Sequence, residues 1–403
     1  MTETTRILIA GGGIGGLAAA LGLTARGHRV TVLERREEFT ELGAGIQLAP
    51  NAFHALDRLG VGRRVRDRAV FIEELQFMDA VSGESVVRMP LTGEYRERFG
   101  NPYAVVHRGD LYQPLLNACR AADGIELLPG RSVAWYEQTA AEVTAVTEGG
   151  ERFTGAALIG ADGIRSAVRR QLVGDGEPRV SGHTIYRSVI PMSLVPEELR
   201  WNRVTLWAGP GWHFVHYPIG GGEFLNLAAT RDDGATEAVV GLPVEHSHVL
   251  DEFPGLSDSA RRLLELGGEW KTWVLCDRDP VDVWTDGRVA LLGDAAHPML
   301  QYAAQGACMA LEDAVVLGEL LEGDGRDVAR DMAQRLEKYT ARRRDRTART
   351  QLVAREIGSR LYHAAGQAAR ARNTLLSSFS EQELHDRVKW LHGSHDLTEG
   401  VGS

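Results

Sequence analysis

Three glycines near the N-terminus could cradle a phosphate group. Gly11, Gly13 and Gly16 form the pattern G-x-G-x-x-G directly after the apolar run 7–9. In this pattern the first glycine makes a tight turn, the second lets the backbone approach a pyrophosphate, and the third lets a helix pack on a strand. The following helix would offer unpaired N–H groups and its positive dipole end to the phosphates. The spacing predicts a dinucleotide site, with a purely structural glycine-rich turn as the alternative.

A carboxylate stands where the sugar of such a dinucleotide would need a partner. The segment predicts a helix from Ile14 to about Arg26, followed by a strand in which Val30 and Val32 alternate with polar residues. Glu34 ends this strand, and a carboxylate there can accept a hydrogen bond from a ribose hydroxyl. Glycines, helix, strand and acid therefore fit one strand–helix–strand unit.

Two aspartates each follow a short apolar run and precede a helix. Asp162 stands in the segment GADG after residues 157–159, and Asp294 stands in GDAAHP after residues 289–292. Ligands of an open parallel sheet bind at the carboxyl ends of its strands, where an aspartate can accept a hydrogen bond from a hydroxyl. Taken alone, either segment would equally fit an ordinary turn with a capping aspartate. The helix after the second segment is predicted over about 306–320.

One strand carries two polar side chains that could meet a second ligand. In the run 212–217, a period of two places His213, Val215 and Tyr217 on the same face. That face could line an apolar pocket in which the His213 imidazole and the Tyr217 hydroxyl are the polar groups. A satisfied sheet histidine and a core tyrosine are the alternative interpretation.

Two further positions fit either a ligand contact or an ordinary surface feature. Gly43 and Gly45 in the loop ending at Gln47 would let a flat ligand approach closely, or they would form a simple turn. Arg108 directly precedes a predicted helix and is either a ligand contact or a solvated arginine.

Composition limits the classes of function. The 403 residues carry a net charge of −10, with 43% hydrophobic and 25% charged residues, as in a globular protein without a broad nucleic-acid surface. The three widely spaced cysteines predict neither a disulfide framework nor a metal site, and free thiols fit a reducing cytoplasm. No apolar run reaches the length of a membrane span, and the first strand starts too early for a signal peptide.

The C-terminal part reads as helical and contains a basic cluster. Its apolar residues follow helical spacing, and the cluster consists of Arg342, Arg343, Arg344, Arg346 and Arg349. A solvated helix face is the simplest interpretation of this cluster. A dimer contact or weak attraction to an anionic surface are the alternatives.

Taken together, the glycine unit with Glu34, the GADG segment and the GDAAHP segment resemble the three signatures of the flavoprotein aromatic hydroxylases. These single-component FAD monooxygenases are typified by para-hydroxybenzoate hydroxylase. The resemblance implies tightly bound FAD without a metal, and NADH as a transient co-substrate. The cofactor-binding residues that we infer from the motifs and this resemblance are Gly11, Gly13, Ile14, Gly15, Gly16, Glu34, Arg35, Gln47, Arg108, Asp162, Asp294, Gly306 and Ala307.

The motif order and the resemblance together predict an α/β fold. It comprises a Rossmann-type FAD-binding domain (1–72, 99–178 and 280–325), an inserted β-rich substrate domain (73–98 and 179–279) and a C-terminal helical region (326–403). We expect a cytoplasmic homodimer without integral membrane association. One departure from the more distant family members is Ala304-Gln305-Gly306-Ala307, which stands where they carry a Gly-x-Gly pair.

Within this family, the stretches GAGIQLAP and HFVHYPIGGGEFLN most resemble the 3-hydroxybenzoate 6-hydroxylases. This implies hydroxylation of 3-hydroxybenzoate para to its hydroxyl, giving 2,5-dihydroxybenzoate (gentisate), with O2 activated as a flavin C4a-hydroperoxide. The resemblance makes His213, Gln301 and Tyr217 the catalytic candidates. His213 would accept the phenol proton, while Tyr217 or Gln301 would orient the phenol or hold the carboxylate. The alternatives are a salicylate 1-hydroxylase, a natural-product phenol hydroxylase and an FAD-dependent reductase.

Overall fold

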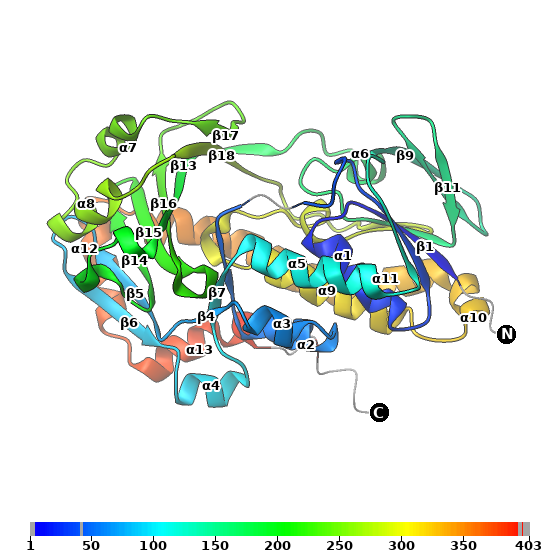
Figure 1. Ribbon diagram of the computed structural model, residues 1–403, viewed down its shortest axis with the longest axis horizontal. Helices are drawn as coiled ribbons and strands as arrows, with labels where there is room; N and C mark the ends of the chain where they lie inside the picture. The colour runs from blue at the N-terminus through cyan, green and yellow to red at the C-terminus, as the bar shows by residue number, and fades with distance from the viewer. Residues whose placement is uncertain (1–4, 41–42, 394–396, 398–403) are drawn as a thin grey trace.

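Two β-sheets lie at opposite ends of an elongated molecule, with long helices between them (Figure 1). The structure is a computed structural model that describes residues 5–40, 43–393 and 397. None of the helices in these ranges is long and apolar enough to cross a membrane. The two sheets and the helices between them position the side chains predicted above.

The first sheet is built from strands that come from three distant parts of the chain. Its order is β19 (Thr285–Asp286), β20 (Val289–Leu291), β12 (Ala157–Gly160), β1 (Arg6–Ala10), β2 (Arg29–Leu33) and β8 (Ile125–Leu128). All neighbours from β20 to β8 are parallel, and only β19 runs antiparallel. Residues 7–9 are fully buried, as expected for a strand covered on both faces. The parallel arrangement brings the carboxyl ends of β1, β2, β12 and β20 to one edge.

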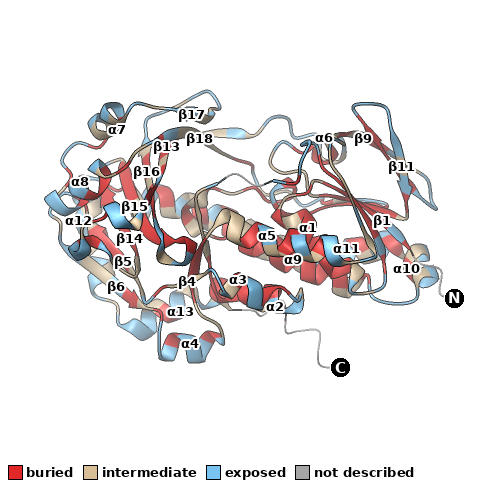
Figure 2. Ribbon diagram, viewed as in Figure 1, coloured by how far each residue is buried: buried red, intermediate tan, exposed pale blue. Residues whose placement is uncertain are grey.

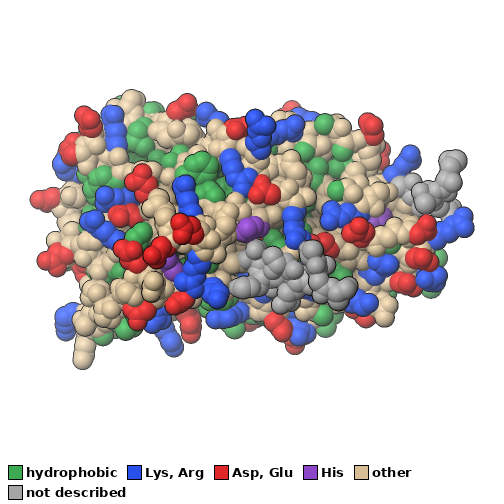
Figure 3. Space-filling view, turned by 90° about the horizontal axis from the view of Figure 1, so that it is seen from below, with side chains coloured by type: hydrophobic (Ala, Val, Ile, Leu, Met, Phe, Trp, Pro, Cys, Tyr) green, Lys and Arg blue, Asp and Glu red, His purple; other side chains and the backbone are tan. Residues whose placement is uncertain are grey.

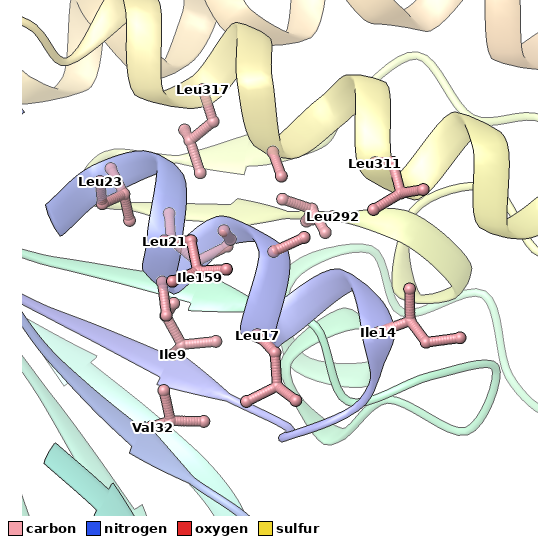
Figure 4. Packing of buried hydrophobic residues seen from close by; sticks show 14 of the residues in the cluster. Ile9, Ile14, Leu17, Leu21, Leu23, Val32, Ile159, Leu292, Leu311 and Leu317 are labelled. Carbon is pink, nitrogen blue, oxygen red and sulfur yellow. The ribbon is translucent and has the colours of Figure 1, made fainter. Parts of the chain in front are cut away.

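Helix α1 (Ile14–Thr24) packs between this sheet and α9 (Gly306–Leu320), with Leu17, Leu292 and Leu311 among the apolar side chains in the contact (Figure 4). The two helices approach closely because Gly22 and Gly318 face each other; a Cβ on Gly318 would lie 2.8 Å from the Gly22 oxygen. The prediction for α9 is confirmed, whereas α1 ends at Thr24, before the predicted Arg26. This packing fixes the start of both helices at the same sheet edge.

The second sheet carries the strand with His213. Its order is β17 (Val240–Pro243), β18 (Lys271–Asp277), β13 (Arg179–Pro191), β16 (Phe224–Asp232), β15 (Trp212–Ile219), β14 (Arg203–Gly209), β5 (Glu74–Asp79) and β6 (Ser85–Pro90). Trp212 and Phe214 pack on one side against the helices α7 (His246–Glu252) and α8 (Asp258–Glu265). The alternate residues of β15 therefore point to the opposite side of the sheet.

Smaller elements complete the regions around the two sheets. The small sheets combine β3 (Gly45–Leu48), β7 (Ala104–His107) and β4 (Val70–Phe71), and β11 (Arg152–Gly155), β10 (Val143–Thr147) and β9 (Val133–Gln138). The further helices of this part are α2 (Pro50–Arg58), α3 (Gly62–Arg66), α4 (Glu94–Phe99), α5 (Arg108–Ala121) and α6 (Ala167–Leu172). The 3-10 turns are η1 (Met192–Leu194), η2 (Glu197–Leu199), η3 (Gly220–Gly222), η4 (Gly293–Ala295) and η5 (Gln301–Ala303).

The C-terminal part is helical, as predicted, but its basic cluster is not a solvated face. The elements are α10 (Gly325–Arg330), α11 (Met332–Glu356), the π-helical turn η6 (Ile357–Tyr362), α12 (Gly366–Ser377) and α13 (Glu381–His392). Arg343 is fully buried in α11 and pairs with Glu312 and Asp313, both on the largely buried helix α9 (Figure 2). Arg346 pairs with Glu312 as well. The solvated interpretation was therefore wrong for these two arginines, which bind α11 to α9.

Candidate functional site

The three glycines of the first motif have three different surroundings. Gly11 has φ +102°, and a Cβ on Gly16 would lie 1.9 Å from the Gly11 oxygen. A larger residue at Gly16 would therefore collide with the backbone. A Cβ on Gly13, in contrast, would meet no atom of residues 5–40, 43–393 or 397 within 4 Å. Two of the glycines thus shape the turn, while the third leaves open space at the start of α1, where a pyrophosphate is expected to approach.

The residues next to this turn combine packing with binding groups. The Ile14 side chain is buried, and a Cβ on Gly15 would lie 2.9 Å from the Leu292 side chain, so both pack into the core. Their backbone N–H groups belong to the first turn of α1, whose N–H groups lack partners within the helix. These two residues can therefore contribute to phosphate binding only through the backbone.

The carboxylate of Glu34 lies beside the glycine turn. Its Oε2 accepts a hydrogen bond from the Gly12 N–H at 2.6 Å, and its Oε1 accepts one from the Arg36 N–H at 2.9 Å. Each oxygen has a further lone pair that can accept from a ribose hydroxyl. Arg35 follows directly and is exposed. The end of β2 thus presents one carboxylate and one cation next to the dinucleotide cradle.

Both predicted aspartates stand at the same sheet edge. Asp162 follows β12; its Oδ2 accepts a hydrogen bond from the Ala167 N–H at 2.8 Å, and its buried Oδ1 has no hydrogen-bond partner within the described ranges. Burial raises the pKa of Asp162, and hydrogen bonds from the start of α6 partly offset this. Asp294 is exposed, and its Oδ1 lies 3.9 Å from a Cβ placed on Gly306. The carboxylate of Asp294 therefore lies beside the first turn of α9, which also includes Ala307.

The loop before β3 connects the first sheet region to the second sheet. The Gly45 N–H donates a hydrogen bond to the Asn226 side chain at 2.9 Å, and a Cβ on Gly45 would lie 2.5 Å from the Tyr217 ring. Arg108 lies against Gly43 in the same way, since a Cβ there would be 2.6 Å from its Cδ. Both glycines therefore make room for protein side chains, and a ligand contact of this loop stays a prediction.

Gln47 is oriented by a tyrosine in this region. Its Oε1 accepts a hydrogen bond from the Tyr103 hydroxyl at 2.5 Å. Burial raises the pKa of Tyr217 to about 12, while the charge of Arg187 and a hydrogen bond with Gln47 act in the opposite direction. Gln47 therefore lies beside the substrate-side strand as well as in the loop.

The register of the second sheet confirms the face predicted for His213, Val215 and Tyr217. Val215 pairs with Ala228 on β16, which in turn pairs with Arg187 on β13. Because residues opposite each other share a face, Arg187 lies on the same face as His213 and Tyr217. Sequence reasoning missed this arginine. Arg187 stands in the stretch Ile185–Ile190 of β13, between apolar and small side chains, but its face depends on pairing across two strands.

Arg187 contacts one of the predicted catalytic residues. Its guanidinium donates a hydrogen bond to Oε1 of Gln301, whose Nε2 lies 3.5 Å from the Thr230 hydroxyl. Gln301 belongs to η5, shortly before α9, and thus lies between the second sheet and the start of that helix. Burial lowers the pKa of Arg187, but arginine remains a cation at neutral pH. The structure therefore brings a cation, an amide and His213 together.

His213 is held by a residue that sequence reasoning did not identify. Its Nδ1 lies 2.8 Å from Nε2 of His363, which follows the π-helical turn η6. The rings of Tyr302 and Tyr362 lie 5.4 and 4.9 Å from the His213 ring, centroid to centroid. Burial, with His363 and His183 nearby, holds the pKa of His213 well below its ordinary value. His213 is thus a neutral base with one nitrogen fixed and the other, Nε2, without a hydrogen bond to any described residue.

A buried ion network on α9 holds the loop that carries Asp294. Nε2 of His297 lies 2.6 Å from Oδ2 of Asp313, which also accepts from the Gly293 N–H at 3.0 Å. Although burial opposes it, His297 and Arg343 hold the pKa of Asp313 at about 2. These contacts fix Gly293, the residue immediately before Asp294. The network therefore orients the loop that carries the second aspartate.

The geometry defines a dinucleotide-binding α/β protein in which a second sheet turns polar side chains toward the same region. The family model described as "FAD binding domain" matches residues 4–213 and 255–354. The chain is 49% identical over 391 residues to 3-hydroxybenzoate 6-hydroxylase 1 of Aquipseudomonas alcaligenes, covering 97% of this chain and 98% of that one. It is 44% identical to 3-hydroxybenzoate 6-hydroxylase of Klebsiella oxytoca, covering 98% of both chains.

Solved structures agree with this assignment. A salicylate hydroxylase substrate complex superimposes with a TM-score of 0.82 at 26% identity, covering 96% of this chain and 95% of that one. HpxO of Klebsiella pneumoniae complexed with FAD and uric acid gives 0.83 at 26% identity, covering 98% of both. The chain therefore belongs to the FAD-binding family of flavoprotein aromatic hydroxylases, as predicted. It is an FAD-dependent aromatic monooxygenase. Among the described residues, Gly13 has open space and Oδ1 of Asp162 has no hydrogen-bond partner, and both features fit its FAD.

Proposed function

We propose that this enzyme hydroxylates 3-hydroxybenzoate para to its hydroxyl, giving 2,5-dihydroxybenzoate (gentisate), with NADH and O2. The observation that carries the proposal is that Arg187 and His213 share one face of the second sheet, close to Gln301. A cation for a carboxylate and a neutral base for a phenol are the two groups that a hydroxybenzoate requires. The 3-hydroxybenzoate 6-hydroxylases that align with nearly the whole chain support the same substrate.

FAD would be held by the glycine turn, Glu34, Asp162 and Asp294, with Arg35, Gln47 and Arg108 in contact range. When bound and reduced by the nicotinamide donor, FAD supplies the activated oxygen that is transferred to the ring. The N–H groups of Gly306 and Ala307 lie at the positive end of α9, where they would stabilise negative charge on the flavin. The apolar surroundings would keep water from the reacting atoms.

In this proposal His213 takes the phenol proton while the ring is attacked. A phenol that loses its proton becomes electron-rich at the ortho and para positions, and carbon 6 is para to the hydroxyl. The hydrogen bond from Nδ1 to His363 fixes the ring, so that Nε2 can accept the proton. Because burial keeps His213 neutral, the base is available without prior deprotonation.

Arg187 and Gln301 would bind the carboxylate as a pair. The guanidinium can donate two hydrogen bonds to a carboxylate, and its contact with Oε1 of Gln301 orients it. With the carboxylate held there, Tyr217 lies on the same sheet face as His213 and can orient the phenol. Two fixed points on a flat ring determine which carbon faces the flavin.

A salicylate 1-hydroxylase is the second candidate, favoured by the structural match to a salicylate hydroxylase substrate complex. A hydroxylase of a larger natural-product phenol and an FAD-dependent reductase are less well supported. The reductase would consume NADH without matching oxygen uptake. Salicylate would yield catechol and carbon dioxide, so the product separates these two hydroxylases.

The test uses purified, FAD-loaded protein with 3-hydroxybenzoate. NADH oxidation, oxygen uptake and product formation are followed together, and each assay is repeated with NADPH. We expect gentisate in step with NADH. Hydrogen peroxide as the main product would make 3-hydroxybenzoate an effector, and no stimulation would reject it as substrate. The homodimer and the cytoplasmic location stay predictions, the first to be tested by light scattering of the purified protein.

A further inference from the structure

Three potential metal ligands meet next to the His213–His363 pair. A nitrogen of His183, a nitrogen of His363 and an oxygen of Asp232 all lie within 4.8 Å of one another. Nε2 of His183 lies 3.8 Å from Oδ2 of Asp232. His183 is on β13, Asp232 ends β16, and His363 follows η6, more than a hundred positions after the other two. They come together only in the fold.

The second nitrogen of each histidine is already engaged. Nδ1 of His183 lies 2.5 Å from the Tyr302 hydroxyl, and Nε2 of His363 lies 2.8 Å from Nδ1 of His213. Metal-bound histidines typically make such a hydrogen bond through the nitrogen that does not bind the ion, which fixes the tautomer and the ring orientation. The remaining atoms are Nε2 of His183 and Nδ1 of His363. Both rings are therefore held as ligand histidines are.

One of these remaining atoms is buried without a partner. His363 is 7% exposed, and its Nδ1 makes no hydrogen bond to any residue that the structure describes. A buried polar nitrogen without a partner costs free energy, so its retention calls for an explanation. A metal ion would supply the missing partner.

We propose that His183, Asp232 and His363 form a site for one divalent transition-metal ion of the zinc class, and that the bound ion inhibits hydroxylation. The inhibition part rests on the proposed role of His213. An ion on Nδ1 of His363 leaves the proton of that ring on Nε2, which then donates to Nδ1 of His213. His213 would then carry its own proton on Nε2 and could not accept one from the phenol. Binding itself does not depend on that role.

The donor set selects the kind of ion. Two imidazoles and one carboxylate suit zinc, nickel or cobalt, whereas magnesium and calcium prefer sites made of oxygen ligands. Zinc bonds of about 2.0–2.1 Å in a tetrahedron place ligand atoms roughly 3.3 Å apart. The present spacing is wider, so the site must contract on binding. The Asp232 side chain is 53% exposed and can move inward. Three protein ligands leave the fourth position of the tetrahedron to a water molecule.

The test measures zinc binding to the untagged, FAD-loaded protein by equilibrium dialysis. Wild type should bind one zinc ion per chain, and Asp232→Asn should bind it at least about tenfold more weakly. Asp233→Asn is the matched control, because this exposed neighbour is outside the ligand set. His183→Asn should also weaken binding; if it fails to retain FAD, the Asp232 variant decides. Equal zinc affinity in wild type and Asp232→Asn, or no zinc bound by wild type, would overturn the site.

The inhibition is measured separately on the same variants. Zinc should slow substrate hydroxylation by wild type and by Asp233→Asn to the same extent, at the concentration that fills the dialysis site. Asp232→Asn should need about tenfold more zinc. Zinc that binds without slowing turnover would refute the inhibition. Failure of the proposed substrate is recognised independently, from the product formed without any metal.

Discussion

The cofactor end and the substrate face of this enzyme are built in opposite ways. At the cofactor end, Gly11, Gly13, Gly16 and Glu34 belong to one continuous strand–helix–strand unit. At the substrate face, His213 contacts a residue 150 positions away, and the partner of Arg187 is 114 positions away. A local unit can be recognised as a motif, whereas a face assembled across strands depends on the register of the whole sheet.

The same contrast predicts how the two regions respond to substitution. The glycines define the backbone path of the first sheet, so changes there affect folding and FAD binding together. The His213 face of the second sheet lies opposite the core around Trp212 and Phe214, although Tyr217 on this face also belongs to a smaller apolar cluster. Changes on the polar face should therefore alter chemistry while the fold and the flavin remain. Surface charge does not distinguish the two regions on the face shown in Figure 3, where basic and acidic side chains are interspersed.

The largest effect is expected at Gly16. A Cβ there would lie 1.9 Å from the Gly11 oxygen, so Gly16→Ala should lower the free energy of unfolding by about 3 kcal/mol and yield protein without flavin. Gly13→Ala is the matched variant, because its Cβ meets nothing within 4 Å. It should unfold like wild type without FAD but bind FAD at least about tenfold more weakly. Thermal unfolding of the apoproteins and FAD titration measure both. Equal behaviour of the two variants would contradict the different roles assigned to these glycines.

His213→Asn should have the opposite effect to Gly16→Ala: hydroxylation is lost while the fold and the flavin are retained. An asparagine amide can keep a hydrogen bond toward His363 but cannot accept the phenol proton, so we expect about 100-fold slower coupled hydroxylation. FAD content and thermal stability should stay near wild type. The measurement compares NADH oxidation, product and hydrogen peroxide, with His248→Asn as an exposed control. Normal product formation by His213→Asn would remove this residue from the proposed mechanism.

What could be predicted from the sequence follows the same division. The glycine motif, the aspartate segments and helix α9 are local patterns, and strand alternation alone placed His213, Val215 and Tyr217 on one face. Arg187 could not be placed, because the face that it shares with His213 depends on the pairing of β13 with β16 and of β16 with β15. His363 follows a π-helical turn, which periodicity does not reveal.

The sequence does contain a signal for the buried position of the basic cluster, namely two acids on another helix. Glu312 and Asp313 are adjacent acids in the apolar middle of helix α9, and buried acids require cationic partners. Arg343 and Arg346 supply them from α11. Considered together, the two helices would have predicted a buried ion network rather than a solvated face.

Arg187→Met tests whether Arg187 on the substrate face binds the substrate carboxylate. Methionine retains much of the length but removes the charge, so the KM for 3-hydroxybenzoate should rise about 10- to 100-fold, the loss of a charged hydrogen bond. The neutral analogue 3-hydroxybenzyl alcohol should be affected little, because it has no carboxylate. Steady-state kinetics with both compounds give the result. An equal loss for both would assign Arg187 to positioning Gln301 instead of binding the carboxylate.

The smallest effect is expected at Ala304, where the two regions meet between Gln301 and α9. Ala304 has φ +52° and ψ +38°, a left-handed conformation that disfavours any residue with a Cβ. Ala304→Gly relieves this strain but loosens the unfolded chain, so the free energy of unfolding should rise by about 0.5 kcal/mol with FAD content unchanged. Ala303→Gly, one position earlier in the η5 turn, should lower it by roughly 0.5–1 kcal/mol. Denaturant unfolding of both variants decides. If Ala304→Gly destabilises the protein as much as Ala303→Gly does, the backbone at Ala304 is not strained.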